Sequence, residues 1–247
     1  MQNRIRLAML ASGGGTTVEA ILRECREGGL PDIDPALLIT DRPGAGVVER
    51  ASRMGLINHR LIERRRFGHD IEAFGEELCQ ALQESNIDLV GQYGWLSLTP
   101  ANVIKTFDNG RRIINQHPAP VPWFGGRGMW GKRPHAAVLK FRELCWKERD
   151  RLVDNTRVVS QFVAERFDRG AVIHYKSVPI LDGDTPATLQ QRALLVEWQT
   201  QTDALWLFAN GLVDRPNTYI YYTDLFVLPG EEDLAKEAVR YALTTEP

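Results

Sequence analysis

The first half of the chain alternates short apolar runs with segments of helical periodicity. Apolar runs bounded by turn residues predict buried strands, and apolar residues at every third or fourth position predict helices. The predicted strands are 5–10, 36–40, 57–62, 88–91 and 112–116, and the predicted helices between them are 18–26, 47–54 and 70–84. Strands that alternate with helices are typical of a mostly parallel sheet with helices on both faces.

The second half has a different pattern. Two β-rich runs flank a turn-like segment and predict an antiparallel hairpin, and a long helix follows them. The predicted elements are strands at 156–163 and 171–178, a helix at 185–210, a strand at 219–227 and a helix at 231–242. No linker-like change of composition separates the halves. The sequence therefore predicts one α/β domain with antiparallel additions in its C-terminal half.

Composition narrows the class of protein. The chain has 247 residues, of which 43% are hydrophobic and 25% charged, as in ordinary globular proteins. Its net charge of -2 argues against a dedicated nucleic-acid binder, and the basic run Arg64–Arg66 is followed closely by acidic residues, which favours a solvated loop. No apolar stretch approaches the roughly 18 residues that a membrane helix needs.

Cysteine and histidine positions exclude two further kinds of site. The three cysteines are far apart and form no CxxC pair, which argues against a disulfide framework and favours a reducing cytoplasm. His59 and His69 have no partners at metal-binding spacing, so we expect no metal site.

A glycine-rich turn joins the first predicted strand to the first predicted helix. Its residues are Gly13, Gly14, Gly15, Thr16 and Thr17. Glycines let backbone N–H groups approach an anion, and a helix N-terminus adds partial positive charge. The turn lacks the Gly-Lys-Ser/Thr of a phosphate-binding P-loop and the third glycine of a dinucleotide fingerprint. Phosphate binding and a ligand-free tight turn are therefore equally weighted.

Asn115 and His117 end the fifth predicted strand, immediately before Pro118. Side chains alternate along a strand, so both point to the same face at the edge where parallel sheets bind ligands. Asn supplies an amide donor, and His supplies a donor or a base. For an isolated Asn-x-His pair, a structural histidine is the favoured alternative.

Two further features stand out in the middle of the chain. The loop 122–131 combines large apolar residues with glycines that include Gly125, Gly126 and Gly128, and His135 follows it. The loop is either a mobile wall over a cleft or an irregular packed connection. Asp168 lies in the predicted hairpin turn, where an isolated aspartate is usually a turn former.

Taken in order, these features resemble the phosphoribosylglycinamide formyltransferase family. The resemblance spans roughly residues 5–200, and the combination is far more specific than any single motif. The matching segments are Ser12–Thr16, Asn115-x-His117-Pro118, Phe124–Gly131 with His135, Phe167-Asp168-x-Gly170, and Leu181–Leu189 with Arg192 and Glu197. The resemblance implies a Rossmann-like formyltransferase fold and an enzyme that transfers a formyl group from 10-formyltetrahydrofolate, its co-substrate, to the amine of glycinamide ribonucleotide in purine biosynthesis.

The resemblance also implies roles for individual residues. Asn115, His117 and Asp168 would be the catalytic trio. The Gly13–Thr17 turn would hold the substrate phosphate, and Glu197 would lie near the ribose or amine end of the nucleotide. The residues that would form the folate pocket, largely through backbone groups, are Tyr93, Gly94, Trp95, Leu96 and Ser97.

Two departures from the family pattern lie on the nucleotide side. Thr17 stands where the family often has Asn, and Trp198 stands where it commonly has His. An acceptor other than glycinamide ribonucleotide, such as an amino sugar nucleotide, therefore remains an alternative, as does a folate- or nucleotide-binding protein without catalysis. We expect residues 1–200 to form the catalytic domain and residues 201–247 to form an extension packed on it, as a structural addition or a homodimer contact.

Overall fold

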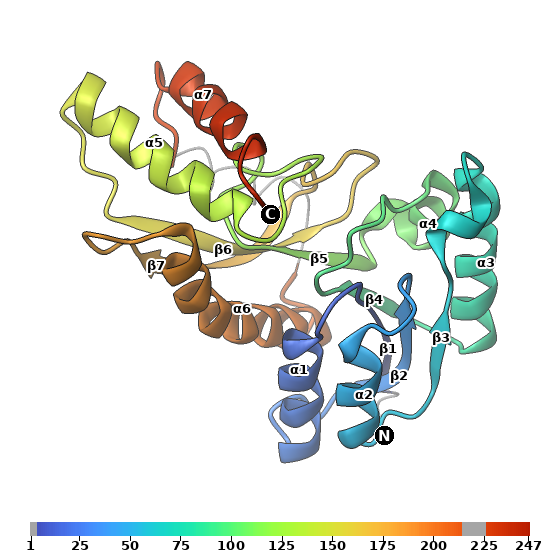
Figure 1. Ribbon diagram of the computed structural model, residues 1–247. Coiled ribbons are helices and arrows are strands. Elements are labelled where there is room, and N and C mark those ends of the chain that lie inside the picture. The colour runs from blue at the N-terminus through green and yellow to red at the C-terminus, as the bar shows by residue number, and fades with distance from the viewer. Residues whose placement is uncertain (1–3, 214–225) are drawn as a thin grey trace. The chain divides into compact units, whose positions relative to one another are not determined.

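The computed structural model describes residues 4–213 and 226–247 (Figure 1). The chain divides into two compact units. The first unit contains residues 4–116, 162–166 and 201–213, and the second contains residues 117–161, 167–200 and 226–247. Among these residues, no helix is both long enough and apolar enough to cross a membrane.

A parallel sheet forms the centre of the first unit. Its strands are β1 (Ile5–Leu10), β2 (Ile33–Thr40), β3 (His59–Leu61), β4 (Leu89–Gln92) and β5 (Ile113–His117), in the order β3-β2-β1-β4-β5. Leu10 is in register with Ile39 on one side and with Gln92 on the other, so the carboxyl ends of three strands are level. The strand order reverses direction at β1, and open α/β sheets bind ligands at the carboxyl edge beside such a point.

Helices cover both faces of this sheet, as the sequence predicts. Helices α1 (Thr16–Glu27) and α2 (Gly46–Arg53) pack on one face, whereas α3 (Ile71–Glu84) and α4 (Ala101–Thr106) lie on the other (Figure 1). Strand side chains alternate between the two faces. Ala8 and Leu10 therefore join the α3 side of the core with Phe74, while Leu7 and Met9 are buried outside that cluster. The two 3-10 turns are η1 (Arg64–Phe67) and η2 (Asp108–Gly110).

The second unit is built on an antiparallel pair of strands. Its elements are β6 (Asn155–Phe162), β7 (Val172–Pro179), α5 (Arg133–Arg149) and α7 (Glu232–Leu243), together with the first part of α6 (Pro186–Ala209), whose last residues belong to the first unit. Helices α5 and α7 pack against each other. Their buried side chains share one apolar core with Phe124 and Met129 of the 122–131 loop.

The predicted strands and helices of the first half are all present, with ends that differ by at most three residues. The antiparallel hairpin, the long helix and the closing helix are also confirmed, as β6 and β7, α6 and α7. The predicted strand at 219–227 lies mostly outside the described residues, and Phe226 and Val227 are in a turn and a bend. The α/β class, mostly parallel with antiparallel additions, is therefore correct.

Candidate functional site

The Gly13–Gly15 turn lies at the carboxyl end of β1, and α1 begins directly after it at Thr16. Gly15 is the N-cap residue in a left-handed conformation, with φ +77°, and no side chain caps the helix. A Cβ atom on Gly15 would lie 2.8 Å from the Cα atom of Val47, so only glycine fits there. Gly13 and Gly14 are exposed. An exposed glycine backbone that leads into a helix N-terminus suits an anion.

The two threonines of this turn have different surroundings. Thr16 is half-buried, whereas Thr17 is only 3% exposed. The exposed backbone and Thr16 are therefore the parts of the turn that a phosphate can reach most directly. The helix begins two residues earlier than the apolar pattern predicts, so both threonines belong to its first turn.

The segment Tyr93–Ser97 follows β4 and packs against the Gly13–Gly15 turn. The Ser12 N–H donates to the Gly94 carbonyl at 3.1 Å, and the Leu96 N–H donates to Ser12 Oγ at 2.9 Å. The rings of Tyr93 and Trp95 are buried, and burial raises the pKa of the Tyr93 phenol. The large side chains thus face the core, which leaves the exposed Gly94 and the half-buried Leu96 and Ser97 at the edge.

Asp41 is a polar residue at the same edge that sequence reasoning missed. It follows β2 directly and is buried, and Ser97 Oγ donates a hydrogen bond of 2.6 Å to its Oδ2 atom. A signal for it existed in the sequence, because a carboxylate directly after a buried parallel strand lies at the ligand-binding edge. The first unit therefore brings together the turn, the 93–97 segment and Asp41.

His117 and Asp168 lie side by side in the second unit, although 51 positions separate them in the sequence. The His117 Nδ1 atom lies 3.5 Å from Asp168 Oδ2, and both side chains are buried. The opposite ring nitrogen, Nε2, is 2.8 Å from the Phe124 carbonyl oxygen, which only accepts hydrogen bonds. Nε2 therefore carries a proton, and Nδ1 is the atom that faces the carboxylate.

The 122–131 loop holds both residues in place. The Gly126 N–H donates to Asp168 Oδ2 at 2.8 Å, and Phe124 contributes the carbonyl that His117 contacts. A Cβ atom on Gly125 would lie 2.4 Å from the Asp168 Cβ atom, so the loop passes too close for any other residue. Phe124 of this loop is fully buried in the core, which anchors the loop on one side.

His135 lies in the first turn of α5, and its side chain is almost completely buried. Burial, together with the nearby charge of His117, lowers the pKa of His135 to about 4. His135 is therefore neutral near pH 7. Its Nδ1 atom is buried and has no hydrogen-bond partner among the described residues.

Asn115 and Glu197 complete the predicted set. Asn115 is half-buried on β5, in register with Gln92, and lies two positions before His117 on the same face of the strand. Glu197 lies on α6 and is 7% exposed. Burial raises the pKa of Glu197 to about 8, which means that its carboxyl group is largely protonated near neutral pH.

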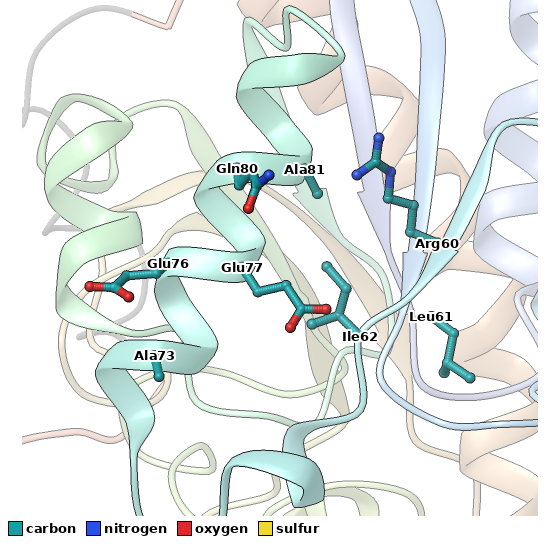
Figure 2. Close-up of a pocket in the computed structure, with 8 residues that line it drawn as sticks. All are labelled: Arg60, Leu61, Ile62, Ala73, Glu76, Glu77, Gln80 and Ala81. Atoms are coloured by element: carbon teal, nitrogen blue, oxygen red, sulfur yellow. The ribbon is translucent and has the colours of Figure 1, made fainter.

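A surface pocket of about 660 Å³ lies apart from all of these residues, between β3 and α3 (Figure 2). It is lined by Arg60, Leu61, Ile62, Ala73, Glu76, Glu77, Gln80 and Ala81. Two of its charged groups form ion pairs, from Arg60 to Glu84 at 2.8 Å and from Glu77 to Arg66 at 3.5 Å. The basic run thus has local acidic partners, and none of the predicted site residues lines this pocket.

Among the described residues, no group of three or more His, Cys, Asp or Glu side chains is arranged to hold a metal ion.

The C-terminal tail packs against the 122–131 loop, and we expect this contact to restrain the loop. Arg133 Nε donates to the Thr245 carbonyl at 3.0 Å, and its Nη1 atom donates to the Gly128 carbonyl at 3.2 Å. Because Arg133→Ala removes both bonds, it should lower the free energy of unfolding by about 1–3 kcal/mol and speed amide hydrogen exchange across residues 124–131. Urea unfolding and exchange mass spectrometry measure the two effects.

Arg142 provides the control for this prediction, because it lies on the same helix and bonds instead to Leu181 and Asp182. Arg142→Ala should leave exchange in residues 124–131 unchanged. Equal exchange rates in the Arg133 variant and the wild type would contradict the restraint.

Comparisons with known proteins place this geometry in a family. Residues 5–205 match the formyl transferase family, so the chain belongs to it. Over 191 residues the chain is 31% identical to a chloroplastic phosphoribosylglycinamide formyltransferase of Arabidopsis thaliana, which covers 77% of the chain and 61% of that protein. The corresponding enzyme of Bacillus subtilis is 27% identical over 187 residues, with 76% of the chain and 86% of that protein covered.

Solved structures agree with this assignment. Glycinamide ribonucleotide transformylase 1 of Symbiobacterium toebii superimposes with a TM-score of 0.71 at 32% identity, covering 85% of this chain and 90% of that one. Phosphoribosylglycinamide formyltransferase of Bacillus halodurans gives a TM-score of 0.67 at 31% identity, covering 87% and 99%. The chain spans about three fifths of the Arabidopsis relative and 19% of a trifunctional purine biosynthetic protein of Gallus gallus.

Proposed function

We propose that this chain transfers the formyl group of 10-formyltetrahydrofolate to the primary amine of glycinamide ribonucleotide, a step of purine biosynthesis. The observation that carries the proposal is the pairing of His117 Nδ1 with the Asp168 carboxylate at 3.5 Å, held by the Gly126 N–H in a member of the formyl transferase family. The names of the relatives and of the solved structures support the choice of acceptor.

The reaction needs donors for an oxyanion and a path for a proton. The amine lone pair attacks the formyl carbon, and the C=O electron pair moves onto the oxygen. The Asn115 amide and protonated His117 donate hydrogen bonds to that oxygen. The bond between the formyl carbon and folate N10 then breaks and N10 gains a proton, while the former amine loses one. Asp168 orients His117 and takes part in moving that proton, directly or through water.

The structure adds a condition to this scheme. His117 Nε2 is hydrogen-bonded to the Phe124 carbonyl, and Nδ1 faces Asp168. Donation to the oxyanion therefore requires one ring nitrogen to exchange its protein partner for substrate. Catalytic hydrogen bonds are often long in ligand-free enzymes and shorten in the substrate complex, as the 3.5 Å separation allows.

The proposal also assigns binding roles to the other residues of the candidate site. We assign the substrate phosphate to the Gly13–Thr17 turn and the nucleotide's ribose or amine end to Glu197. The folate is assigned to the 93–97 segment, and the Gly125, Gly126, Gly128 and His135 region is assigned to the wall of the cleft.

Residues 1–200 would act as the catalytic domain and residues 201–247 as an extension packed on it. We further propose a cytoplasmic enzyme with small-molecule substrates, no metal and a homodimeric state.

A different amine acceptor, such as an amino sugar nucleotide, is the second candidate. It is favoured by Thr17, which stands where the family often has Asn and is only 3% exposed. Trp198 stands beside Glu197 where the family commonly has His. Both departures concern the acceptor and leave the formyl-transfer residues unchanged.

Purified protein incubated with 10-formyltetrahydrofolate and glycinamide ribonucleotide should release tetrahydrofolate in proportion to enzyme concentration. Parallel reactions with an amino sugar nucleotide, and with no acceptor, measure acceptor choice and background hydrolysis. Turnover with the amino sugar nucleotide and none with glycinamide ribonucleotide would replace the first proposal with the second. Tight binding of both ligands without turnover would make the chain a non-catalytic binder.

A further inference from the structure

Gln161 is the side chain that contacts the far oxygen of Asp168. Its Nε2 atom donates a hydrogen bond of 2.9 Å to Asp168 Oδ1, while the Gly126 N–H donates to Oδ2 at 2.8 Å. The carboxylate therefore has a donor on each oxygen, and its Oδ2 atom is the one that faces His117. We propose that Gln161 is a positioning residue that sets the rotation of the Asp168 carboxylate toward His117. This inference rests on the proposed formyl transfer.

The local backbone suits this role. Gln161 lies on β6 opposite a β-bulge of β7, because Ser160 is in register with His174 whereas Gln161 is in register with Val172, which leaves Ile173 of β7 out of register. A bulge leaves one residue out of register and re-aims the neighbouring side chains, and bulges are common beside active sites. Gln161 is 1% exposed, so its amide has little freedom to swing away. Gln161 is thus a buried donor beside the irregular part of the β6–β7 pair, and it bonds directly to Asp168.

Asp168 needs such support. Its φ of +54° lies in the left-handed region, which non-glycine residues adopt uncommonly and at some cost in backbone strain. Gln161 approaches the carboxylate from β6 and Gly126 approaches it from the 122–131 loop. Bonds to two oxygens from two separate segments prevent the carboxylate from rotating about its Cβ–Cγ bond. The hydrogen bond from the strand and the one from the loop therefore act together.

The chemistry of the amide explains why glutamine occupies this position. An amide donor stabilises the negative charge of a carboxylate without adding a positive charge that would compete with His117. Glutamine at this position has a cost in stability, because Gln161 Oε1 is buried and has no hydrogen-bond partner among the described residues. A buried polar atom without a partner is unfavourable. An apolar side chain would avoid that cost, so the N–H bond to Asp168 is the reason for an amide here.

Three replacements test the role. Gln161→Met keeps the length and removes the donor, Gln161→Asn keeps the amide and shortens its reach, and Gln161→His supplies a different N–H donor. We expect the Met and Asn variants to lower kcat by about ten- to a hundredfold with KM for both substrates nearly unchanged, and the His variant to retain most of the wild-type kcat. Ser160→Ala, on the same strand, is the control and should keep wild-type kinetics.

A second measurement does not depend on turnover. In the Met variant Asp168 Oδ1 loses the hydrogen bond from Gln161, so the Gly126 amide should exchange with solvent faster than in the wild type, while amides in α1 stay unchanged. If the wild type shows no turnover but Gly126 exchanges faster in the Met variant than in the wild type, the proposed function fails while this inference stands. Wild-type kcat in the Met variant would overturn the inference. So would a kcat loss that His does not rescue, or unchanged Gly126 exchange.

Discussion

Asp168→Asn is expected to lower kcat for formyl transfer by about 10²–10⁴-fold, the usual contribution of a positioned acid–base group. Asparagine removes the negative charge that faces His117 Nδ1 at 3.5 Å. The carboxylate accepts hydrogen bonds from both the Gly126 N–H and the Gln161 amide. Asparagine has only one acceptor oxygen, so one of these two donors would face an N–H₂ group instead. The substitution therefore disturbs both the charge and the hydrogen bonds of the pair.

His117→Ala should have an effect of similar size, because it removes an oxyanion donor whose loss typically costs about 10²–10³-fold. Residues that act as one unit are strongly non-additive. The double variant should therefore be only slightly slower than the slower single variant. Steady-state kinetics with saturating 10-formyltetrahydrofolate, together with unfolding curves to confirm folding, measure this directly.

Asp182 supplies a matched control for the pair. Its side chain is 98% exposed, and its ion pair with Arg142 at 2.6 Å lies on the surface. Asp182→Asn should therefore retain wild-type kcat. Losses in the His117 and Asp168 variants that multiply in the double variant would show that the two residues act independently, contrary to the proposed pair.

Apart from the short helix α4, the helices and strands of the first half could be predicted from the sequence because each carries its own local signal. A buried parallel strand is a short apolar run, and its helix presents one apolar face to the sheet. The long helix α6 is equally predictable from the sequence, because Thr185 and Pro186 are typical of a helix start and Gly211 is typical of a helix end. In the structure Thr185 Oγ1 accepts the Thr188 N–H at 3.2 Å, and Gly211 takes a left-handed φ of +65°.

Helix α5 escaped prediction for a physical reason. Its buried residues include His135, Ala136, Ala137 and Val138 in succession, so no single polar face marks it as amphipathic. Helix α7 packs on α5, and the apolar core of the second unit covers much of the rest. A helix that is buried on several sides loses the periodic contrast on which sequence patterns depend. Helix α5 is therefore defined by its packing against other elements rather than by the local helix propensity of its sequence.

The candidate site also contains residues that a sequence pattern predicts and residues that no pattern predicts. Asn115, His117 and the glycine turn were found because strand ends and glycine-rich turns mark the ligand edge of a sheet. Gln161 carries no such mark, since it lies inside a β-strand and acquires its contact with Asp168 through a bulge and a long hairpin turn. Its importance depends on distances between segments, which the sequence alone does not give.

Glu197→Gln is expected to raise stability at alkaline pH by a few kcal/mol. Burial raises the pKa of Glu197 from its ordinary value of 4.5 to about 8. Below pH 4.5 the carboxyl group is protonated in both the folded and the unfolded chain, so its burial carries no charge penalty. Between pH 4.5 and about 8 the unfolded chain binds fewer protons than the folded one, and stability falls as pH rises. One pKa unit corresponds to about 1.4 kcal/mol, so the full window sets an upper bound of about 5 kcal/mol.

Urea unfolding from pH 4 to pH 9 tests this expectation. The free energy of unfolding of the wild type and of Glu197→Gln should agree near pH 4 and diverge steadily to pH 8, where the variant is more stable. Glu148→Gln, which changes an exposed glutamate, should follow the wild type at every pH. A constant difference between the Glu197 variant and the wild type would mean that packing, rather than proton binding, separates them. Weaker nucleotide binding in the more stable variant would indicate that this buried carboxyl group is retained for its ligand at a cost to the fold.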